Sequence, residues 1–504
     1  MPTRVLDTQE ALGLSVRLVM DPKPDDYATL SHCWGQTHVA RLTRATQHRF
    51  ALDIPITSLP KTFRHAIQVV RTLGIRYLWI DSLCIIQDSA SDWEVESSLM
   101  ASVYGHGLVN LAATSSADSQ GGLFFERDVM MVQPFAAHIP GSELLNEGWY
   151  VWKDDGRWGD LADEPLNRRG WVLQERLLSP RTIHFTSSEV IWQCLEDLAS
   201  ESIPDQTELN SSQRLRVQAM EVGDYTDIRI AVARARHEGL SPENEEEVYE
   251  KWMTVVSHFS NCRLTKETDK LVAIYGMVRQ VEELTGDACL AGLWRSQIPR
   301  HLVWAVNWGP SKDNATIRDS LTPGTRSRPE KWRAPSWSWA SLDLPVGFKY
   351  HPKGTVCQAE LVEGGVERTP NGAVLSAKLV IKAPLVAIRI ETDSGGRVIS
   401  GWRRGWVPSV GENASAVFYV QMDDMEGHDP IVGQACLILE DPNFAFFILL
   451  QASEPSAGNS GDQAFRRVGA LMMGYPLLLK DDAWSPFFAR EPKWDPYSQV
   501  VNLV

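Results

Sequence analysis

The hydrophobic positions of the first 200 residues switch repeatedly between two periods. Short stretches that alternate apolar and polar side chains, or that are apolar throughout, are separated by stretches with apolar residues at helical spacing. The helical stretches carry boundary signals: Pro60 and Gly74 bound the first, and a Ser91-x-x-Glu94 capping box opens the second. Strand, helix, strand, helix, strand is typical of a parallel sheet covered by helices, so the pattern predicts an α/β domain. The expected strands are 27–32, 75–81 and 108–114, and the expected helices are 59–74 and 92–104.

The pattern changes twice further along the chain. A helix followed by a hairpin is predicted over 165–194, and it completes the first domain. The next 50 residues or so are polar and acidic, as in a solvated linker that enters a helix, and a helical block follows. From Arg333 onward the period is two, with turn-forming residues between the runs, which predicts an antiparallel β module. We therefore expect a first domain at 1–200 with its core at 27–193, a linker and helical segment at 201–320, and a β-rich C-terminal domain at 321–504.

Composition limits the kinds of partner. The 504 residues carry a net charge of -15, which disfavours sequence-independent binding to nucleic acid or to an anionic membrane. No window approaches 18 uninterrupted apolar residues, and the start of the chain lacks the apolar core of a secretory signal, so we expect no membrane span. Seven cysteines, odd in number and without a C-x-x-C pair, are typical of a reducing compartment, so we expect a cytoplasmic protein.

Polar side chains follow three of the predicted strands. Because the carboxyl ends of parallel strands meet at one edge of the sheet, where α/β proteins bind ligands, we expect these side chains to line a crevice. Metal-ligand spacing, a P-loop and a dinucleotide-binding glycine pattern are absent from the sequence, which disfavours a metal centre or a classical nucleotide fold. The three rims are Ser31, His32, Cys33, Trp34 and Gly35; Asp81, Ser82 and Cys84; and Thr114, Ser115 and Ser116.

Glu96 is the acidic residue whose predicted position most strongly indicates a catalytic acid. A carboxylate held beside apolar rings at the end of a sheet is costly to ionise unless it is paired, and enzymes obtain acids of raised pKa in this way. The alternative is that an arginine, Arg169 or Arg176, neutralises Glu96 in a structural ion pair. The underlying helical wheel puts Val95, Leu99 and Val103 in the core stripe and Trp93, Glu96, Met100 and Tyr104 along its edge.

Asp81 and the arginines have two interpretations each. Asp81 can line the crevice, or it can cap the turn after its strand. Arg168, Arg169 and Arg176 can bind a phosphate or carboxylate, or they can pair with acidic residues such as Glu175.

The thiols are weaker candidates. Cys33 and His32 are adjacent in a strand and so point to opposite faces, which counts against a catalytic pair. His32 with Cys84 is then the pair to consider, although the apolar neighbours of Cys84 favour a buried structural thiol.

Three blocks of the chain, in order and spacing, resemble the fungal heterokaryon incompatibility (HET) domain. The resemblance covers about residues 27–193, and it implies a role in non-self recognition between fungal individuals, where incompatible partners trigger growth arrest and programmed cell death. It also implies protein partners, through self-assembly or through an incompatibility partner. The blocks are YATLSHCWG, LPKTFRHAIQVVRTLGIRYLWIDSLCIIQDSASDWEVESSLMASVYGHGLVNLAAT and RGWVLQERLLSPRTIHF.

A looser resemblance connects the domain to the TIR fold, a parallel α/β domain of immune signalling. Some TIR domains cleave NAD at its glycosidic bond with a helix glutamate. LSHCWG is similar to the first TIR strand and its loop, and SASDWEVES is similar to the helix start that carries the glutamate. The resemblance therefore puts the catalytic role on Glu96, with NAD as a possible substrate and no cofactor required. The residues expected to contact a ligand in the crevice are Ser31, Trp34, Gly35, Asp81, Trp93, Tyr104, Arg169 and Arg176.

Three functional hypotheses remain open at this point. The first is a cell-death signalling module that hydrolyses NAD or a related nucleotide in the crevice. The second is a non-enzymatic interaction module in which the acids and arginines form a structural network. The third is a biosynthetic enzyme or a Cys/His hydrolase that uses the same crevice.

Overall fold

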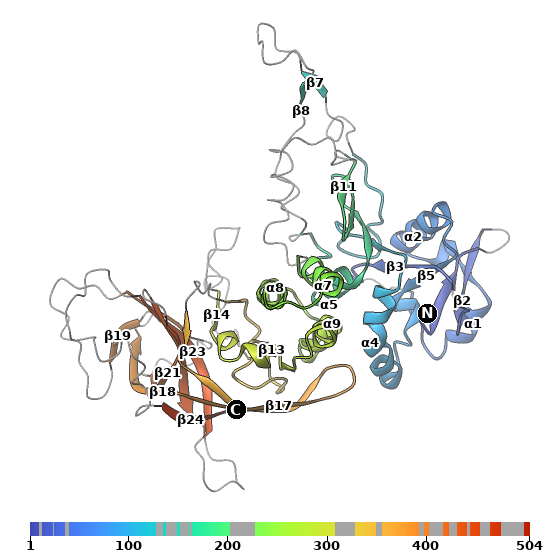
Figure 1. The fold of residues 1–504 in the computed structure, drawn as a ribbon. Coiled ribbons are helices and arrows are strands. Elements are labelled where there is room, and N and C mark those ends of the chain that lie inside the picture. Colours follow the sequence, from blue (N-terminus) through green and yellow to red (C-terminus); the bar gives the residue numbers. More distant parts are fainter. Residues whose placement is uncertain are drawn as a thin grey trace. The chain divides into compact units, whose positions relative to one another are not determined.

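The chain forms two compact units in a computed structural model (Figure 1). Unit 1 comprises residues 1–237, 262–264 and 272–279, and unit 2 comprises 238–261, 265–271 and 280–504. Within the residues that the structure describes, no helix is both long and apolar enough to cross a bilayer. The described residues are 1–9, 13–23, 25–35, 40–127, 135–137, 149–151, 161, 164–201, 227–307, 328–348, 355–392, 398–402, 417–422, 431–440, 444–453, 464–474 and 498–504.

Unit 1 is built on a nine-stranded mixed sheet with the strand order β11-β10-β9-β6-β3-β5-β1-β2-β4. Its centre consists of four parallel strands, β9, β6, β3 and β5, each shielded by neighbours on both sides. β3, β5 and β6 are buried along their whole length, as strands covered on both faces must be. The predicted α/β class is therefore confirmed, and so is the hairpin, which pairs β9 with β10.

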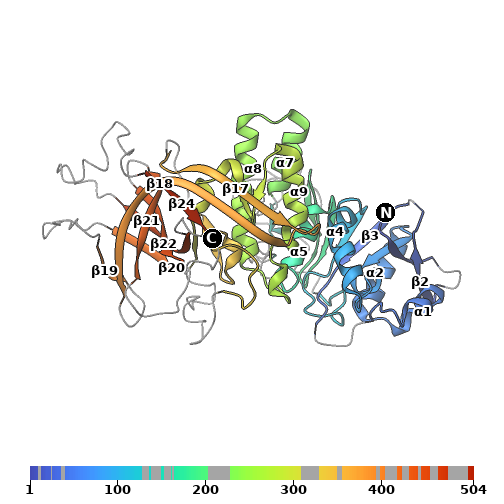
Figure 2. The same ribbon diagram turned by 90° about the horizontal axis from the view of Figure 1, so that it is seen from below.

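Antiparallel strands extend this parallel centre on both sides. β1 pairs with β5 and with β2, and this N-terminal hairpin was not predicted from the sequence. The helices that connect the parallel strands lie on opposite faces of the sheet, with α2 on one face and α4 and α5 on the other (Figures 1 and 2). The connection from β3 to β5 runs across the sheet in one direction, and the connections from β5 to β6 and from β6 to β9 run in the other. Because each crossover is right-handed, the change of direction puts the connecting helices on opposite faces.

The elements of unit 1 follow the chain in this order. The strands are β1 (Arg4–Asp7), β2 (Ser15–Met20), β3 (Tyr27–Ser31), β4 (Ile54–Pro55), β5 (Tyr77–Ile80), β6 (Val109–Ala112), β7 (Phe135–Ala137), β8 (Trp149–Val151), β9 (Arg181–Phe185), β10 (Val190–Cys194) and β11 (Leu198–Ser200). The helices are α1 (Gln47–Leu52), α2 (Lys61–Thr72), α3 (Asp81–Cys84), α4 (Ala90–Gly105), α5 (Gly170–Leu178) and α7 (Asp227–Glu238), with a 3-10 turn at Ile56–Ser58.

Unit 2 combines helices with a second nine-stranded sheet. That sheet is antiparallel apart from the parallel pair β23 and β24, and β17 and β18 form a long hairpin at its edge (Figure 2). The fully buried guanidinium of Arg467 lies 3.3 Å from the centre of the Trp304 ring and donates to the backbone oxygen of Leu302 at 2.6 Å. The tryptophans of unit 2 that are 0 % exposed are core residues, as expected for large rings: Trp252, Trp294, Trp304, Trp337 and Trp339.

The bounds in unit 2 are as follows. The helices are α8 (Pro242–Ser260) and α9 (Tyr275–Thr285); the first residues of α9 belong to unit 1. The 3-10 turns of unit 2 are Glu267–Asp269, Arg295–Gln297, Arg300–Leu302 and Trp339–Ser341. The strands are β12 (Cys289–Leu290), β13 (Leu293–Trp294), β14 (Trp304–Val306), β15 (Val346–Phe348), β16 (Val356–Cys357), β17 (Glu360–Arg368), β18 (Val374–Thr392), β19 (Val398–Trp402), β20 (Val417–Met422), β21 (Ile431–Glu440), β22 (Phe444–Ala452), β23 (Ala464–Gly474) and β24 (Ser498–Leu503).

Candidate functional site

The carboxyl ends of the parallel strands meet at one edge of the unit 1 sheet. β6, β3 and β5 are neighbours and run in the same direction, so the three predicted polar rims lie side by side, as expected. The chain leaves β3 toward β5 on one side and later returns to β6 on the other, which creates a topological switch point between β3 and β6. Doubly wound α/β proteins bind ligands outside such a point. The residues at the ends of β3 and β6 are therefore the first candidates.

A buried carboxylate, Glu175, lies at this switch point. It belongs to α5, the helix between β6 and β9, and it is 5 % exposed. Its Oε2 accepts a hydrogen bond from Ser31 Oγ at the end of β3. Ser31 Oγ in turn accepts a hydrogen bond from Asn110 Nδ2 in β6, at 3.0 Å. Polar side chains of the two strands that flank the switch point thus connect to one acidic group.

Three predicted site residues surround Glu175. Burial raises the pKa of Glu175, and the charge of Arg169 together with hydrogen bonds from Ser31 and Tyr104 opposes that rise. Burial also raises the pKa of Tyr104 well above the ordinary tyrosine value. Arg169 donates a hydrogen bond to the backbone oxygen of His32, which fixes its guanidinium at the end of β3. The cluster therefore holds a carboxylate of raised pKa close to a hydroxyl, a phenol and a cation.

Trp34 and Asp81 form the next part of the same edge. Trp34 Nε1 donates to Asp81 Oδ2 at 2.8 Å and so links the ends of β3 and β5. The guanidinium of exposed Arg41 lies 5.2 Å from the centre of the Trp34 ring. Asp81 is the first residue of α3, and its Oδ1 accepts from the backbone N–H of the next residue, Ser82, at 2.6 Å.

The third rim turns toward β9. Thr114 Oγ1 lies 3.3 Å from Nδ1 of buried His184, and Ser115 Oγ accepts from the backbone N–H of Ser187 at 2.8 Å. These contacts join the loop after β6 to the β9–β10 hairpin.

The thiols near this edge are poorly suited to nucleophilic chemistry. Burial raises the pKa of Cys33, and it raises the pKa of Cys84 to about 12. Burial lowers the pKa of His32 to about 4, and its Nδ1 lies 3.8 Å from Asp81 Oδ1. Because the thiolate is the nucleophile, a thiol of raised pKa reacts slowly at neutral pH. The geometry therefore favours the structural interpretation of Cys84.

Glu96 is held by the N-terminal hairpin. Its side chain is 3 % exposed, and Oε1 accepts hydrogen bonds from Arg4 Nη2 at 2.9 Å and from Thr3 Oγ1. Arg4 Nη2 also bonds to both carboxylate oxygens of Asp92, at 2.8 and 2.7 Å. Burial raises the pKa of Glu96, while the Thr3 hydrogen bond and the Arg4 charge oppose the rise. Glu96 thus shares one arginine with a second acid, and its other oxygen, Oε2, is buried without a hydrogen-bond partner among the described residues.

Arg169 and Arg176, the arginines predicted to neutralise Glu96, are not its ion-pair partners. The partner of Glu96 is Arg4 in β1, whereas Arg169 bonds to the backbone of His32, and Arg176 Nε donates to Gln193 Oε1 at 2.9 Å. The correct partner lies 92 positions earlier in the chain, in a strand too short to show a clear pattern.

The predicted phase of the 92–104 helix is also wrong. Val95, assigned to the core stripe, is 54 % exposed, so the buried face is rotated. The helix begins at Ala90, and its N-cap is Ser89, whose Oγ accepts from the backbone N–H of Asp92; the cap is therefore two residues earlier than the predicted one. Trp93 packs edge-on against Trp171 of α5, with ring centres 5.5 Å apart. The buried residues of α4 are Glu96, Ser97, Met100, Val103 and Tyr104.

Asn110 and Glu175 were not identified as site residues from the sequence. Asn110 interrupts the apolar run of a strand that is buried throughout, and Glu175 lies in a helix whose residues 172–178 are all buried. A polar side chain inside an apolar run is the signal that could have found both, since such residues are rarely buried without a partner.

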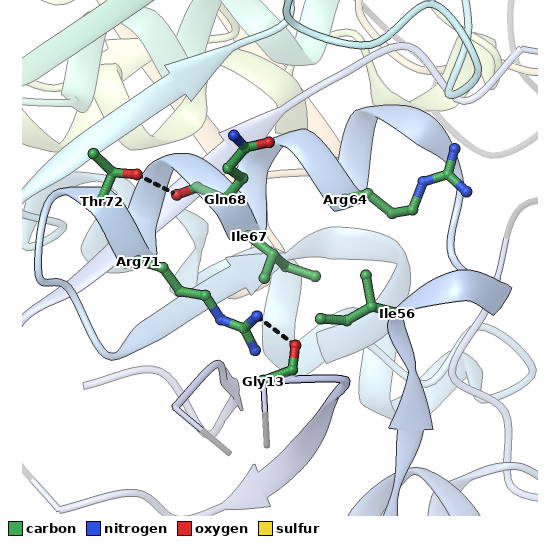
Figure 3. A pocket seen from close by; sticks show the side chains of 7 residues that line it. All are labelled: Gly13, Ile56, Arg64, Ile67, Gln68, Arg71 and Thr72. Atoms are coloured by element: carbon green, nitrogen blue, oxygen red, sulfur yellow. Dashed lines mark hydrogen bonds between the residues drawn. The ribbon is translucent and has the colours of Figure 1, made fainter. Parts of the chain in front are cut away.

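A cavity of about 500 Å³ lies elsewhere in unit 1, along α2 (Figure 3). Arg71 points across it and donates to the backbone oxygen of Gly13 at 2.8 Å, beside the side chains of Ile56 and Ile67. None of the predicted site residues lines this cavity, whose walls are formed by Gly13, Ile56, Arg64, Ile67, Gln68, Arg71 and Thr72.

Fold and site together define a doubly wound α/β domain with a buried carboxylate at its switch point. Residues 27–175 of this domain match the family model of the Heterokaryon incompatibility protein (HET). The chain therefore contains a HET domain, and this match confirms the resemblance seen in the sequence. No curated protein and no solved structure matches the chain significantly.

Proposed function

We propose that this chain signals non-self recognition in the cytoplasm by cleaving the glycosidic bond of NAD or a related nucleotide at the switch point of its HET domain. In this proposal Glu175 supplies the catalytic carboxylate, and cleavage leads to growth arrest and cell death. The position of Glu175 carries the proposal: it is bonded to Ser31 at the end of β3, where a doubly wound sheet binds its ligand. The earlier assignment of this role to Glu96 stays a competing prediction.

The chemistry needs a carboxylate near the ribose. The bond between ribose C1′ and the nicotinamide nitrogen breaks, and its electron pair neutralises the positively charged nitrogen, so nicotinamide leaves without a proton. The ribose acquires oxocarbenium character, which a nearby carboxylate stabilises before water adds to C1′ and releases a proton. Ionised Glu175 is suited to this role, Arg169 to the nucleotide phosphates, and the Trp34 ring to stacking on a base.

The site has to open before a nucleotide can bind. Glu175 is 5 % exposed and Ser31 is 1 % exposed, so both are inaccessible in the present conformation. Contact with water or with ribose hydroxyls would stabilise the ionised form and lower the raised pKa of Glu175. Assembly with a partner is the expected trigger for opening.

Nicotinamide release from NAD tests the proposal. The full-length chain, concentrated or crowded to promote assembly, is expected to release nicotinamide, and Glu175→Gln is expected to reduce the rate by about 100-fold or more. Glu189→Gln is a matched control, because Glu189 is also buried but lies at the turn between β9 and β10. If the wild-type chain releases none, or if Glu175→Gln retains the wild-type rate, the proposal is overturned.

A non-enzymatic interaction module is the second candidate. The ion pairs of Arg4 with Glu96 and Asp92 favour it, because one predicted catalytic residue is engaged in holding the N-terminal hairpin. In that case Glu175 is also a structural residue, and its bond to Ser31 holds α5 against the end of β3. Partner binding by the wild-type chain and by Glu175→Gln with equal affinity, without nicotinamide release, would support this alternative.

A further inference from the structure

The segment 113–125, which follows β6, packs directly on the end of β3. Ser119 Oγ donates to the backbone oxygens of Cys33 and Trp34, at 3.3 and 3.2 Å. Gly35 has a φ of 70°, and a Cβ added there would lie 2.3 Å from the Cβ of Asp118. Only glycine permits this approach without displacement. The segment therefore closes on the strand end that carries the proposed site.

Helix α2 holds the segment from its other side. The backbone N–H of Thr62 donates to the oxygen of Ser119 at 3.0 Å, and Thr62 Oγ1 accepts from the N–H of Gly122, also at 3.0 Å. Inside the segment, Ser116 Oγ donates to the oxygen of Gly122 at 2.6 Å. These bonds make 116–122 a compact loop that is bound both to α2 and to the end of β3.

His65 of α2 binds that C-terminal end. Its Nδ1 accepts hydrogen bonds from the backbone N–H groups of Leu123 and Phe124, at 3.1 and 3.3 Å. The Phe124 ring stacks on the imidazole with 4.5 Å between ring centres and 24° between planes, and Phe124 is 44 % exposed. An Nδ1 that accepts from two N–H groups must be unprotonated.

Protonation of His65 is incompatible with these contacts. An imidazolium carries a hydrogen on each nitrogen, so Nδ1 could no longer accept and would repel both N–H groups. The bonds to Leu123 and Phe124 would be lost together, because they share one acceptor. His65 is thus the acceptor through which α2 binds Leu123 and Phe124, next to the bond between Thr62 and Gly122.

The charges around His65 favour its neutral form. Burial lowers the pKa of His65 below 6.5, and the positive charges of Lys61 and Arg64 on the same helix lower it further. The segment itself carries Asp118 at the Gly35 side, and exposed Glu126 follows it. Protonation therefore takes place in the acidic range, and the contact is intact at neutral pH.

We propose that His65 is a pH-sensitive latch that holds the segment 113–125 closed over the end of β3. At neutral pH the imidazole binds the segment; on acidification the imidazolium releases Leu123 and Phe124, and the loop can then move away from Cys33 and Trp34. The use of this opening to admit a nucleotide rests on the proposed function. The latch itself does not, because it is defined by the conformation of the segment.

Amide hydrogen exchange of the full-length chain tests the latch. Exchange of Leu123 and Phe124 is measured without nucleotide at about pH 7.5 and about pH 5 and corrected for the intrinsic pH dependence of exchange. We expect protection at the lower pH to fall by about tenfold or more, because two hydrogen bonds are lost together. Amides of β3 are the internal reference, and we expect their corrected protection to change little.

Two variants separate protonation from a general effect of acid. His65→Asn retains an acceptor oxygen that does not titrate, so the segment should stay protected at both pH values. His65→Leu has no acceptor, so the segment should exchange rapidly at both. His106→Gln is the control, because His106 is an exposed histidine at the end of α4, and it should behave as the wild type.

Equal protection of the wild type at both pH values would overturn the latch, and so would a wild-type response in His65→Asn. Either result leaves nicotinamide release untouched. Conversely, an NAD assay without product leaves a positive exchange result standing, so the two failures are distinguishable.

Discussion

Two buried carboxylates lie at the carboxyl edge of one sheet, yet their partners differ. Glu96 is bound by Arg4, from a strand beyond β5, in a network that also contains Asp92. Glu175 is bound by the hydroxyl of Ser31 at the switch point. A carboxylate committed to a buried arginine fixes two elements to each other, whereas a carboxylate bonded to a hydroxyl can exchange that bond for a ligand hydroxyl. On the proposed function, Glu96 therefore has a structural role and Glu175 the catalytic one.

Removal of Arg4 is expected to have the largest effect on stability. Arg4→Met leaves buried Glu96 and half-buried Asp92 without their cation, and breaking a buried pair in this way costs about 3–5 kcal/mol of unfolding free energy. Urea unfolding measures the loss.

Arg76→Met is the matched control for this change. Arg76 also pairs with an acid of β1, Asp7, but it is 44 % exposed, and Arg17 remains as a second partner of Asp7. We expect a loss of about 1 kcal/mol or less. Equal losses in the two variants would contradict a structural role for the Arg4 network.

The two hydroxyl donors offer a smaller test of the comparison. Ser31→Ala removes a donor from Glu175 and is expected to cost about 1–3 kcal/mol, because the group left unsatisfied is a buried acid. Thr3→Val should cost less, since Glu96 keeps its bond to Arg4. A larger loss from Thr3→Val, measured by thermal unfolding, would reverse the assignment.

The smallest expected effect is a pH dependence of stability. Burial raises the pKa of Glu96 and of Glu175 above the ordinary value of 4.5, so the folded chain binds more protons than the unfolded chain. Each group therefore removes stability as the pH rises from about 4.5 through its raised pKa. Glu96→Gln and Glu175→Gln should each lessen this decline in a series of urea unfolding curves.

Asp7 supplies a control of opposite sign. Burial raises its pKa, but hydrogen bonds, first that of Arg76, outweigh burial and hold the pKa below 3.8. Its contribution to stability is therefore present above pH 3.8 and is lost on acidification. The difference in unfolding free energy between the wild type and Asp7→Asn should therefore shrink as the pH falls. If the unfolding free energy of Glu96→Gln or Glu175→Gln declined more steeply with rising pH than that of the wild type, the assigned pKa shifts would be contradicted.

Local pattern predicted the parallel centre of the fold and most of its edge. The β3, β5 and β6 segments and the β9–β10 hairpin carry their own periodicity and turn signals, and parallel pairing then brings Ser31, Trp34 and Asp81 together. The features that the local pattern could not predict depend on contacts between residues far apart in the sequence. Arg4 lies beside Glu96 because β1 pairs with β5, a pairing between segments about 70 residues apart in the sequence.

The role of Glu175 also could not be predicted from local sequence pattern. Its block was identified as part of the family resemblance, but only the strand order puts α5 against the end of β3 and identifies Glu175 as a switch-point residue. The HET match ends at residue 175, so the matched region extends from the first parallel strand to this carboxylate.

The most direct test of the comparison is the rate of nicotinamide release from NAD by Glu96→Gln and Glu175→Gln, measured side by side on chains with equal urea unfolding midpoints. We predict that Glu96→Gln retains the wild-type rate within about threefold, whereas Glu175→Gln loses about 100-fold or more. The reverse order, with Glu175→Gln active and Glu96→Gln inactive, would contradict the assignment and return the catalytic role to Glu96.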